Sequence, residues 1–110
     1  MPRDAGDLLH GTLDLLVMRA LVTEPLHGFA LSRWIDQRTK GELGVADSAL
    51  YKALHRLEDA GAVVAEWGAS ENNRRAKYYS LSARGRQMLR SETAIWKRYV
   101  ATVTAVLEPG

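Results

Sequence analysis

Hydrophobic residues recur every three or four positions in three stretches of the chain, which is the spacing of one face of a helix. These stretches predict helices over residues 8–22, 28–38 and 48–60. Pro25 ends the first helix, because the residue before a proline avoids the helical region. The core-facing side chains expected from the second helix are Phe29, Ala30, Leu31, Trp34 and Ile35.

The predicted third helix carries signals at both ends. Asp47 or Ser48 is expected to cap its first turn by accepting hydrogen bonds from free N–H groups, and Gly61 follows its last residue. The connection before this helix is punctuated by glycines and has room for a very short strand at residues 43–45. Such a strand would add a third member to a neighbouring sheet.

Two extended segments follow, and their composition predicts a β-hairpin. Residues 62–67 and 77–81 carry paired valines and paired tyrosines, which favour strands, and residues 68–73 between them have turn composition. Tyr79 and Leu81 alternate on one strand face and are expected in the core, whereas Tyr78 faces the other way. Ser82 then caps a last helix over residues 83–107.

Three helices, a hairpin and a long helix predict a mainly α fold. Residues 1–82 would form a winged helix-turn-helix, consisting of three helices plus a β-hairpin wing. Residues 83–110 would form a C-terminal dimerisation helix, and the two parts make one compact unit. The length of 110 residues is close to the commonest domain size.

Composition excludes several function classes. The chain has no cysteine, so it has no disulfide, thiolate metal site or cysteine nucleophile. His10, His27 and His55 lie on separate segments, and there is no glycine-rich phosphate loop or nucleophile elbow. We therefore expect no metal, no cofactor and no enzymatic activity. The lack of a secretion signal and of a membrane-length apolar run predicts a cytoplasmic protein without a membrane partner.

Positive charge is concentrated in two segments, although the net charge is only +2. Residues 48–57 contain no acidic residue, and residues 72–91 contain five arginines and one lysine with no Asp or Glu. Such segregation is typical of a nucleic-acid-binding module.

The third helix and the hairpin tip supply the candidate DNA contacts. On a helical wheel the polar and basic side chains of the third helix lie opposite its leucines, with Tyr51 at the boundary. Arginine matches the two acceptors of guanine, and cations at the hairpin tip would neutralise phosphates. The candidates are Ser48, Tyr51, Lys52, His55, Arg56, Asn73, Arg74, Arg75 and Lys77. The plainer interpretation is that these are a solvated helix face and a solvated turn.

The last helix carries an apolar seam with a heptad-like repeat. At 1.5 Å per residue it would be about 37 Å long and would project from the domain, where a two-fold partner could cover it. The predicted interface residues are Leu89, Trp96, Tyr99, Val100, Val103 and Leu107. Trp96 is either an apolar anchor of this interface or, paired across the two-fold axis, one wall of a pocket for a flat aromatic effector. Trp34 is expected in the core, and Trp67 is expected to support the wing.

Four segments together resemble the PadR-like transcriptional regulators, in the short form with one C-terminal helix. They are LHGTLDLL at 9–16, PLHGFAL at 25–31, SALYKALHRLE at 48–58 and SENNRRAKYYSL at 70–81. Two positions depart from the family's usual pattern: Lys52 stands where many relatives have proline, and Phe29 stands where tyrosine is frequent.

The resemblance implies a dimeric repressor that binds a near-palindromic operator in double-stranded DNA. The third helix would enter the major groove through Ser48, Tyr51, Lys52 and Arg56, and the wing would follow the backbone. Some relatives release DNA when a phenolic acid or a flat cationic drug binds near the dimer interface, and others have no known effector. A tryptophan in the last helix resembles the drug-binding type.

A second function class is compatible with the same elements. Winged helices also serve as protein-interaction modules, in which the last helix docks a partner. Such a module would bind DNA weakly and without sequence preference, and it would form a tight complex with another protein.

Overall fold

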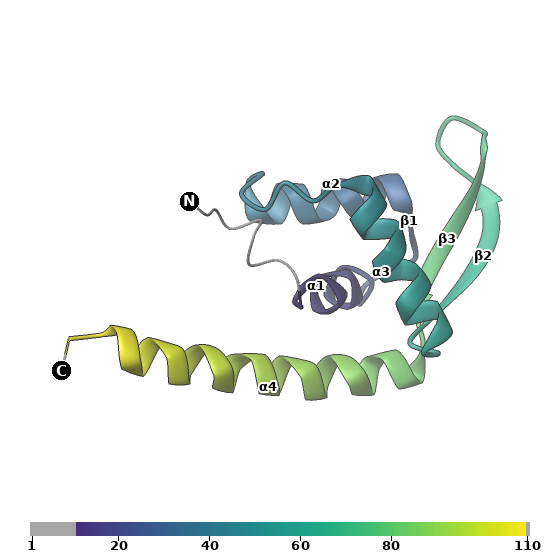
Figure 1. The fold of residues 1–110 in the computed structure, drawn as a ribbon. Coiled ribbons are helices and arrows are strands. Elements are labelled where there is room, and N and C mark those ends of the chain that lie inside the picture. Colours follow the sequence, from purple (N-terminus) through teal and green to yellow (C-terminus); the bar gives the residue numbers. More distant parts are fainter. Residues whose placement is uncertain (1–10, 110) are drawn as a thin grey trace.

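The computed structural model describes residues 11–109. The described chain forms three short helices, a hairpin and one long helix, arranged as Figure 1 shows. The elements are α1 (Leu13–Ala20), β1 (Leu26–His27), α2 (Gly28–Thr39), α3 (Asp47–Asp59), β2 (Val63–Ala69), β3 (Arg75–Leu81) and α4 (Ala83–Leu107). The predicted fold, a mainly α winged helix-turn-helix followed by a long helix, is confirmed.

The core lies between α1, α2, α3 and the base of the sheet, where the apolar faces of these elements meet. Burying one aliphatic side chain of this kind contributes about 1.5–3 kcal/mol, so these contacts are what orients the helices. The largest fully buried side chains are Met18, Leu21, Leu31, Leu50, Leu54, Val17 and Val63. Tyr79 and Leu81 are buried as predicted.

One core prediction for the second helix is wrong. Phe29 is 67% exposed, whereas Leu31 and Ile35 are buried. Phe29 precedes Leu31 by two positions, a rotation of about 200° around a helix, so the two side chains lie on opposite faces. Trp34 is half-buried and packs against the core.

The sheet has three antiparallel strands in the order β1-β3-β2. The predicted third strand at residues 43–45 is wrong, because the third strand is β1, where Leu26 pairs with Tyr79 and His27 with Tyr78. Gly41 and Gly44 have φ angles of +72° and +55°, which turn the chain on both sides of Leu43 and prevent an extended run.

The ends of α3 agree only partly with their sequence signals. The predicted capping by Asp47 or Ser48 is wrong: the helix begins at Asp47, and its N-cap is Ala46, which makes no side-chain cap. At the other end Gly61 has a φ of +76°, the left-handed conformation expected of a residue that terminates a helix. The predicted start of the first helix at residue 8 lies outside the described residues.

A tight joint fixes the start of α4 against the base of the wing. Ser82 caps the helix as predicted, because its Oγ accepts a hydrogen bond from the Gly85 N–H at 3.0 Å. The Ser82 N–H donates to the Ala62 carbonyl at 3.0 Å. From this joint α4 runs along α1 and projects beyond it (Figure 1), which gives the described molecule extents of 56 × 31 × 21 Å. In the described part of the chain, no helix is long and apolar enough to cross a bilayer.

Candidate nucleic-acid interface

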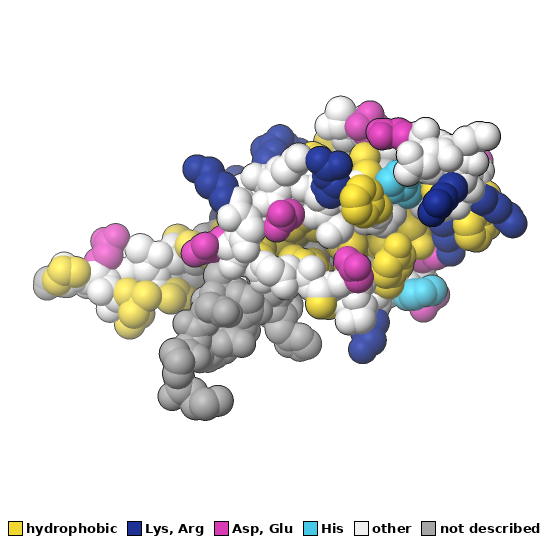
Figure 2. All heavy atoms as spheres, turned by 90° about the horizontal axis from the view of Figure 1, so that it is seen from above, with side chains coloured by type: hydrophobic (Ala, Val, Ile, Leu, Met, Phe, Trp, Pro, Cys, Tyr) yellow, Lys and Arg dark blue, Asp and Glu magenta, His cyan; other side chains and the backbone are white. Residues whose placement is uncertain are grey.

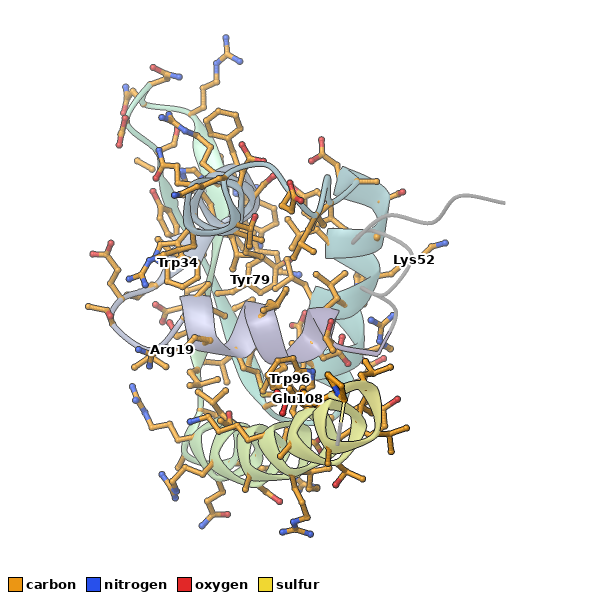
Figure 3. All side chains as sticks on the ribbon, turned by 90° about the vertical axis from the view of Figure 1, so that its left-hand side faces the viewer. Arg19, Trp34, Lys52, Tyr79, Trp96 and Glu108 are labelled. Carbon is orange, nitrogen blue, oxygen red and sulfur yellow. The ribbon has the colours of Figure 1, made fainter. Side chains whose placement is uncertain are left out.

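The outer face of α3 is formed by the residues that the helical wheel predicted. Ser48, Lys52, His55 and Arg56 are all exposed, whereas the opposite face of the helix is buried in the core. Lys52 points away from the body of the protein in Figure 3. A polar, solvent-facing side on a helix anchored by leucines can be placed against DNA without disturbing the fold.

Tyr51 lies against the first residue of α2. It is 46% exposed, and its ring packs over Gly28 so closely that a Cβ at position 28 would clash with the Tyr51 hydroxyl. The absence of a side chain at Gly28 therefore makes room for the aromatic ring.

Arg56 is held by a carboxylate of α1. Its Nη2 donates to Asp14 Oδ1 at 2.7 Å and its Nε to Asp14 Oδ2 at 3.4 Å. This hydrogen bonding raises the pKa of Arg56 above its ordinary value, against a smaller opposing effect of burial. Arg56 remains 57% exposed, so the pair sits at the surface. In the unbound protein the guanidinium thus has a partner already.

The wing tip is an ordered turn. The Ser70 N–H donates to the Arg74 carbonyl at 2.8 Å, and the Asn73 N–H donates to the Ser70 carbonyl at 2.9 Å. Asn73 adopts the left-handed conformation, with a φ of +58°. The strands run further toward the tip than predicted, so Asn73 and Arg74 lie in the turn while Arg75 and Lys77 lie on β3. Asn73, Arg74 and Arg75 are exposed.

The two cations on β3 contact aromatic rings. The guanidinium carbon of Arg75 lies 4.3 Å from the centre of the Trp67 ring, which supports the predicted role of Trp67 in the wing. Lys77 Nζ lies 5.5 Å from the centre of the Tyr79 ring and 3.6 Å from Glu58 Oε1 of α3. Lys77 therefore connects the wing to α3.

The structure brings three of the predicted contact residues around one cavity. Tyr51, Arg75 and Lys77 all line a space of about 730 Å³ between α2 and the wing. Figure 2 looks onto this end of the molecule, where hydrophobic side chains stand among Lys, Arg and His. Arg56 is not among the lining residues, since it lies toward α1.

Sequence reasoning missed the contribution of α2 to this cavity. Phe29 and Arg33 line it from α2, and His27 lines it from the end of β1. The His27 ring makes an edge contact with Tyr78, with ring centres 5.2 Å apart, and its Nδ1 accepts from the Ala30 N–H at 3.1 Å. The pairing of β1 with β3 is what brings these residues to the wing. No local pattern in the sequence reveals that pairing, so the sequence held no signal that could have placed them.

A second cavity, of about 360 Å³, lies between α1 and α4. Trp96 and Tyr99 line it from α4, and Asp14 lines it from α1. Figure 3 shows Trp96 between these two helices. Trp96 is 42% exposed and Tyr99 is 66% exposed, so this face of α4 is open to solvent.

The predicted interface residues of α4 have different surroundings. Leu89 is half-buried and packs against the core of its own chain, and Val100 and Val103 are half-buried. Trp96, Tyr99 and Leu107 are exposed, as are Ile95 and Val106. Within residues 11–109, no group of three His, Asp or Glu side chains could hold a metal ion.

Comparison with known proteins identifies relatives for most of the chain. The sequence model of the transcriptional regulator PadR-like family matches residues 17–91. A solved PadR-family transcriptional regulator from Eggerthella lenta is 30% identical, with 94% of this chain and 88% of that chain covered and a TM-score of 0.81.

Two further relatives are more distant in sequence. A transcriptional regulator from Clostridium thermocellum has the same fold, with a TM-score of 0.84, 22% identity and coverage of 93% of this chain and 96% of that chain. A curated but uncharacterised protein from Lysinibacillus sphaericus is 24% identical over 103 residues, or 94% of each chain.

Proposed function

The chain belongs to the PadR-like family of transcriptional regulators, and on that premise we propose that it is a cytoplasmic, dimeric repressor that reads a near-palindromic operator. Members of this family are DNA-binding regulators and not enzymes. The observation that carries the proposal is the solvent-exposed outer face of α3, which has no acidic residue between residues 48 and 57, next to a cationic wing.

The two surfaces have separate tasks in this proposal. Ser48, Lys52 and His55 on α3 enter the major groove, where polar and basic side chains can reach base edges. Tyr51 stands at the edge of that surface, and Arg56 joins it when Asp14 releases its guanidinium. The wing residues Asn73, Arg74, Arg75 and Lys77 follow the phosphates, which supplies affinity without sequence preference.

A second copy of the chain completes the proposed DNA-binding unit. Helix α4 leaves large apolar side chains in solvent, including Tyr99 at 66% and Leu107 at 76% exposure. Their burial against a two-fold partner removes apolar surface from water and sets two α3 helices at a fixed spacing. The proposed interface consists of Leu89, Trp96, Tyr99, Val100, Val103 and Leu107.

The cavity between α1 and α4 is the proposed effector site. Trp96 and Tyr99 offer flat aromatic faces, and the carboxylates of Asp14 and Glu92 lie at the same cavity. A small aromatic effector seated there would touch both the dimerisation helix and Asp14, the partner of Arg56.

Selection of bound sequences from random duplex DNA at two salt concentrations tests the central proposal. We expect enrichment of a two-fold-symmetric site with half-sites about one helical turn apart. Absence of any enriched motif, with binding lost at moderate salt, would instead favour the protein-interaction module.

Charge variants then separate the wing from α3. Replacing both Arg74 and Arg75 with Ala should lower the slope of log affinity against log salt by about 1.8, since each phosphate contact contributes about 0.9. Lys52→Ala should change sequence preference more than it changes this slope. Arg19→Ala is the matched control, because Arg19 is exposed on α1 and lies on the opposite side from Lys52 in Figure 3.

The dimer is tested by placing a charge in the apolar face of α4. Tyr99→Asp should convert the dimer to a monomer in analytical ultracentrifugation, because a carboxylate would be buried without a partner. Ala101→Asp adds the same charge about 200° around the helix and should leave the dimer intact. If both variants dimerise equally well, this face of α4 does not form the dimer interface.

A further inference from the structure

The cavity between α2 and the wing has the size and lining of a small-molecule site. Its volume of about 730 Å³ falls in the range of known ligand pockets, roughly 300–1,000 Å³. Phe29 contributes from α2 and Trp67 from β2, and these rings are 67% and 60% exposed. Large aromatic side chains that stand in solvent around one hollow are a surface that a flat ligand can cover.

The charges around the cavity favour an anion. Arg33, Arg75 and Lys77 line it, whereas Glu71, in the turn of the hairpin, is its single carboxylate. Among the described residues, neither Arg33 nor Arg75 has a carboxylate within ion-pair distance.

Each free guanidinium lies beside one of the exposed rings. Arg33 is 5.8 Å from the centre of the Phe29 ring, and Arg75 is 4.3 Å from that of Trp67. Stacking on a ring face leaves the N–H groups at the guanidinium edge able to donate to an acceptor. The cavity therefore offers an aromatic surface and unpaired cationic donors together on both of its walls.

We propose that this cavity binds a small planar aromatic anion. Its ring would lie against Phe29 and Trp67, and its anionic group would accept hydrogen bonds from Arg33 and Arg75. The site is separate from the Trp96 cavity, with which it shares no lining residue.

Occupancy of the site would weaken DNA binding by competition, a consequence that rests on the proposed function. Arg75 and Lys77 are proposed phosphate contacts, and both line the cavity. A bound anion would neutralise Arg75 and place its own charge next to the DNA backbone. The ligand would thus act directly at the DNA-binding surface rather than through the dimer interface.

The three tryptophans allow the site to be tested on the unaltered protein. Trp34 and Trp67 line the cavity, whereas Trp96 lies in the other one. Titration with 2-naphthoate, followed by the indole N–H signals in ¹H–¹⁵N NMR, should shift those of Trp34 and Trp67 and leave that of Trp96 in place. A shift of Trp96 alone, or no shift of any signal, overturns the proposal.

Charge dependence is tested with a neutral ligand and matched arginine variants. Neutral 2-naphthamide should bind about tenfold more weakly than 2-naphthoate, and Arg33→Gln should cost 2-naphthoate a similar factor. Arg38→Gln is the control, because Arg38 stacks on Trp34 at 4.8 Å but does not line the cavity. Equal binding of the two ligands, or equal effects of the two variants, contradicts an anion site.

The link to DNA is measured separately. With the selected operator, saturating 2-naphthoate should weaken binding of the wild type at least about threefold and that of Arg33→Gln much less. Unchanged operator affinity, alongside shifted Trp34 and Trp67 signals, would refute the competition while leaving the ligand site established. Failure to find any operator would refute the proposed function without affecting the NMR result.

Discussion

Arg56 of α3 and Asp14 of α1 form a two-point ion pair in which Arg56 Nη2 lies 2.7 Å from Asp14 Oδ1. The pair places a proposed base-reading side chain in contact with a helix that also packs on α4 (Figure 1). Exposed ion pairs of this kind contribute only about 0.2–1 kcal/mol. In the proposed complex, operator DNA can therefore displace Asp14 at little cost, so Asp14 competes only weakly with the DNA for Arg56.

Removing the charge of Asp14 should strengthen operator binding. Asp14→Asn keeps the size of the side chain and weakens its hold on Arg56, so we expect about a two- to fivefold gain in affinity, matching the strength of an exposed pair. Fluorescence anisotropy with the selected operator measures this. The same change in an Arg56→Ala background should have no effect, and a gain that persists there would show that Asp14 acts through another group.

Adding a methyl group at Gly28 should disturb DNA binding more than stability. The φ of Gly28 is not positive, so alanine fits its backbone, but the new Cβ would push the Tyr51 ring away. The ring can rotate into solvent, and we expect a loss of stability below about 1 kcal/mol, at the low end of the roughly 0.5–3 kcal/mol typical of single substitutions. Operator affinity should fall at least about threefold if Tyr51 is a contact.

Tyr51→Phe is the companion to Gly28→Ala, because it keeps the ring and removes the hydroxyl that lies over Gly28. Thermal unfolding and operator titration of both variants separate the two effects. Wild-type affinity in Gly28→Ala, with an unfolding temperature that drops sharply, would show that the contact only holds the fold together.

Ser82, the N-cap of α4, should contribute more to stability than any hydroxyl within that helix. Its Oγ accepts from the Gly85 N–H and lies 2.6 Å from the Gly61 carbonyl oxygen, so one side chain caps α4 and connects it to the end of α3. Loss of an N-cap costs about 0.5–2 kcal/mol, and we expect Ser82→Ala to fall in the upper half of that range.

Thr102→Ala provides the matched control for Ser82. Thr102 Oγ1 bonds only to the Arg98 carbonyl within the same helix, at 2.8 Å, and alanine is the better helix former. Chemical denaturation should find Thr102→Ala neutral or slightly stabilised. Equal losses in the two variants would show that the Ser82 hydroxyl contributes no more than a hydroxyl within the helix, and so contradict the importance of the cap.

Local patterns were sufficient to predict most of the architecture. The buried faces of α1 and α3, the alternation of Tyr79 and Leu81, and the cap at Ser82 depend on residues within a few positions of each other. Periodicity and capping chemistry report on such relationships directly. The exposed positions on α3 could be predicted for the same reason, because they lie opposite a core face with a strong helical period.

Relationships between distant segments could not be predicted. Arg56 and Asp14 are 42 positions apart, and β1 is a strand of two residues that pairs with β3, about 50 positions later in the chain. Neither leaves a periodic trace in the sequence. The cavity between α2 and the wing depends on both the position of β1 and the exposure of Phe29, so it could be recognised only from the three-dimensional arrangement.

Gly85→Ala should reveal how tightly α4 is joined to the wing. A Cβ at position 85 would clash with the Ala62 carbonyl oxygen and would meet Leu81 Cδ1 at 2.7 Å. Unlike the Tyr51 ring over Gly28, the Ala62 carbonyl is backbone that accepts from the Ser82 N–H, so it cannot move aside without breaking the joint. Overpacking of this kind costs about 1–3 kcal/mol, which outweighs the gain in helix propensity from glycine to alanine.

The effect of Gly85→Ala should extend to DNA binding, because in the proposed dimer the joint sets the angle between α4 and α3. A tilted α4 would change the spacing of the two α3 helices, so affinity for the symmetric operator should fall more than affinity for a single half-site. Gln87→Ala, at an exposed position two residues later, is the control. It should change stability by less than about 0.5 kcal/mol and leave the ratio of full-operator to half-site affinity unchanged. Unfolding curves and titrations of full and half operators measure both quantities. If Gly85→Ala is destabilised but keeps the wild-type ratio of full-operator to half-site affinity, the joint contributes to stability and not to the spacing of the α3 helices.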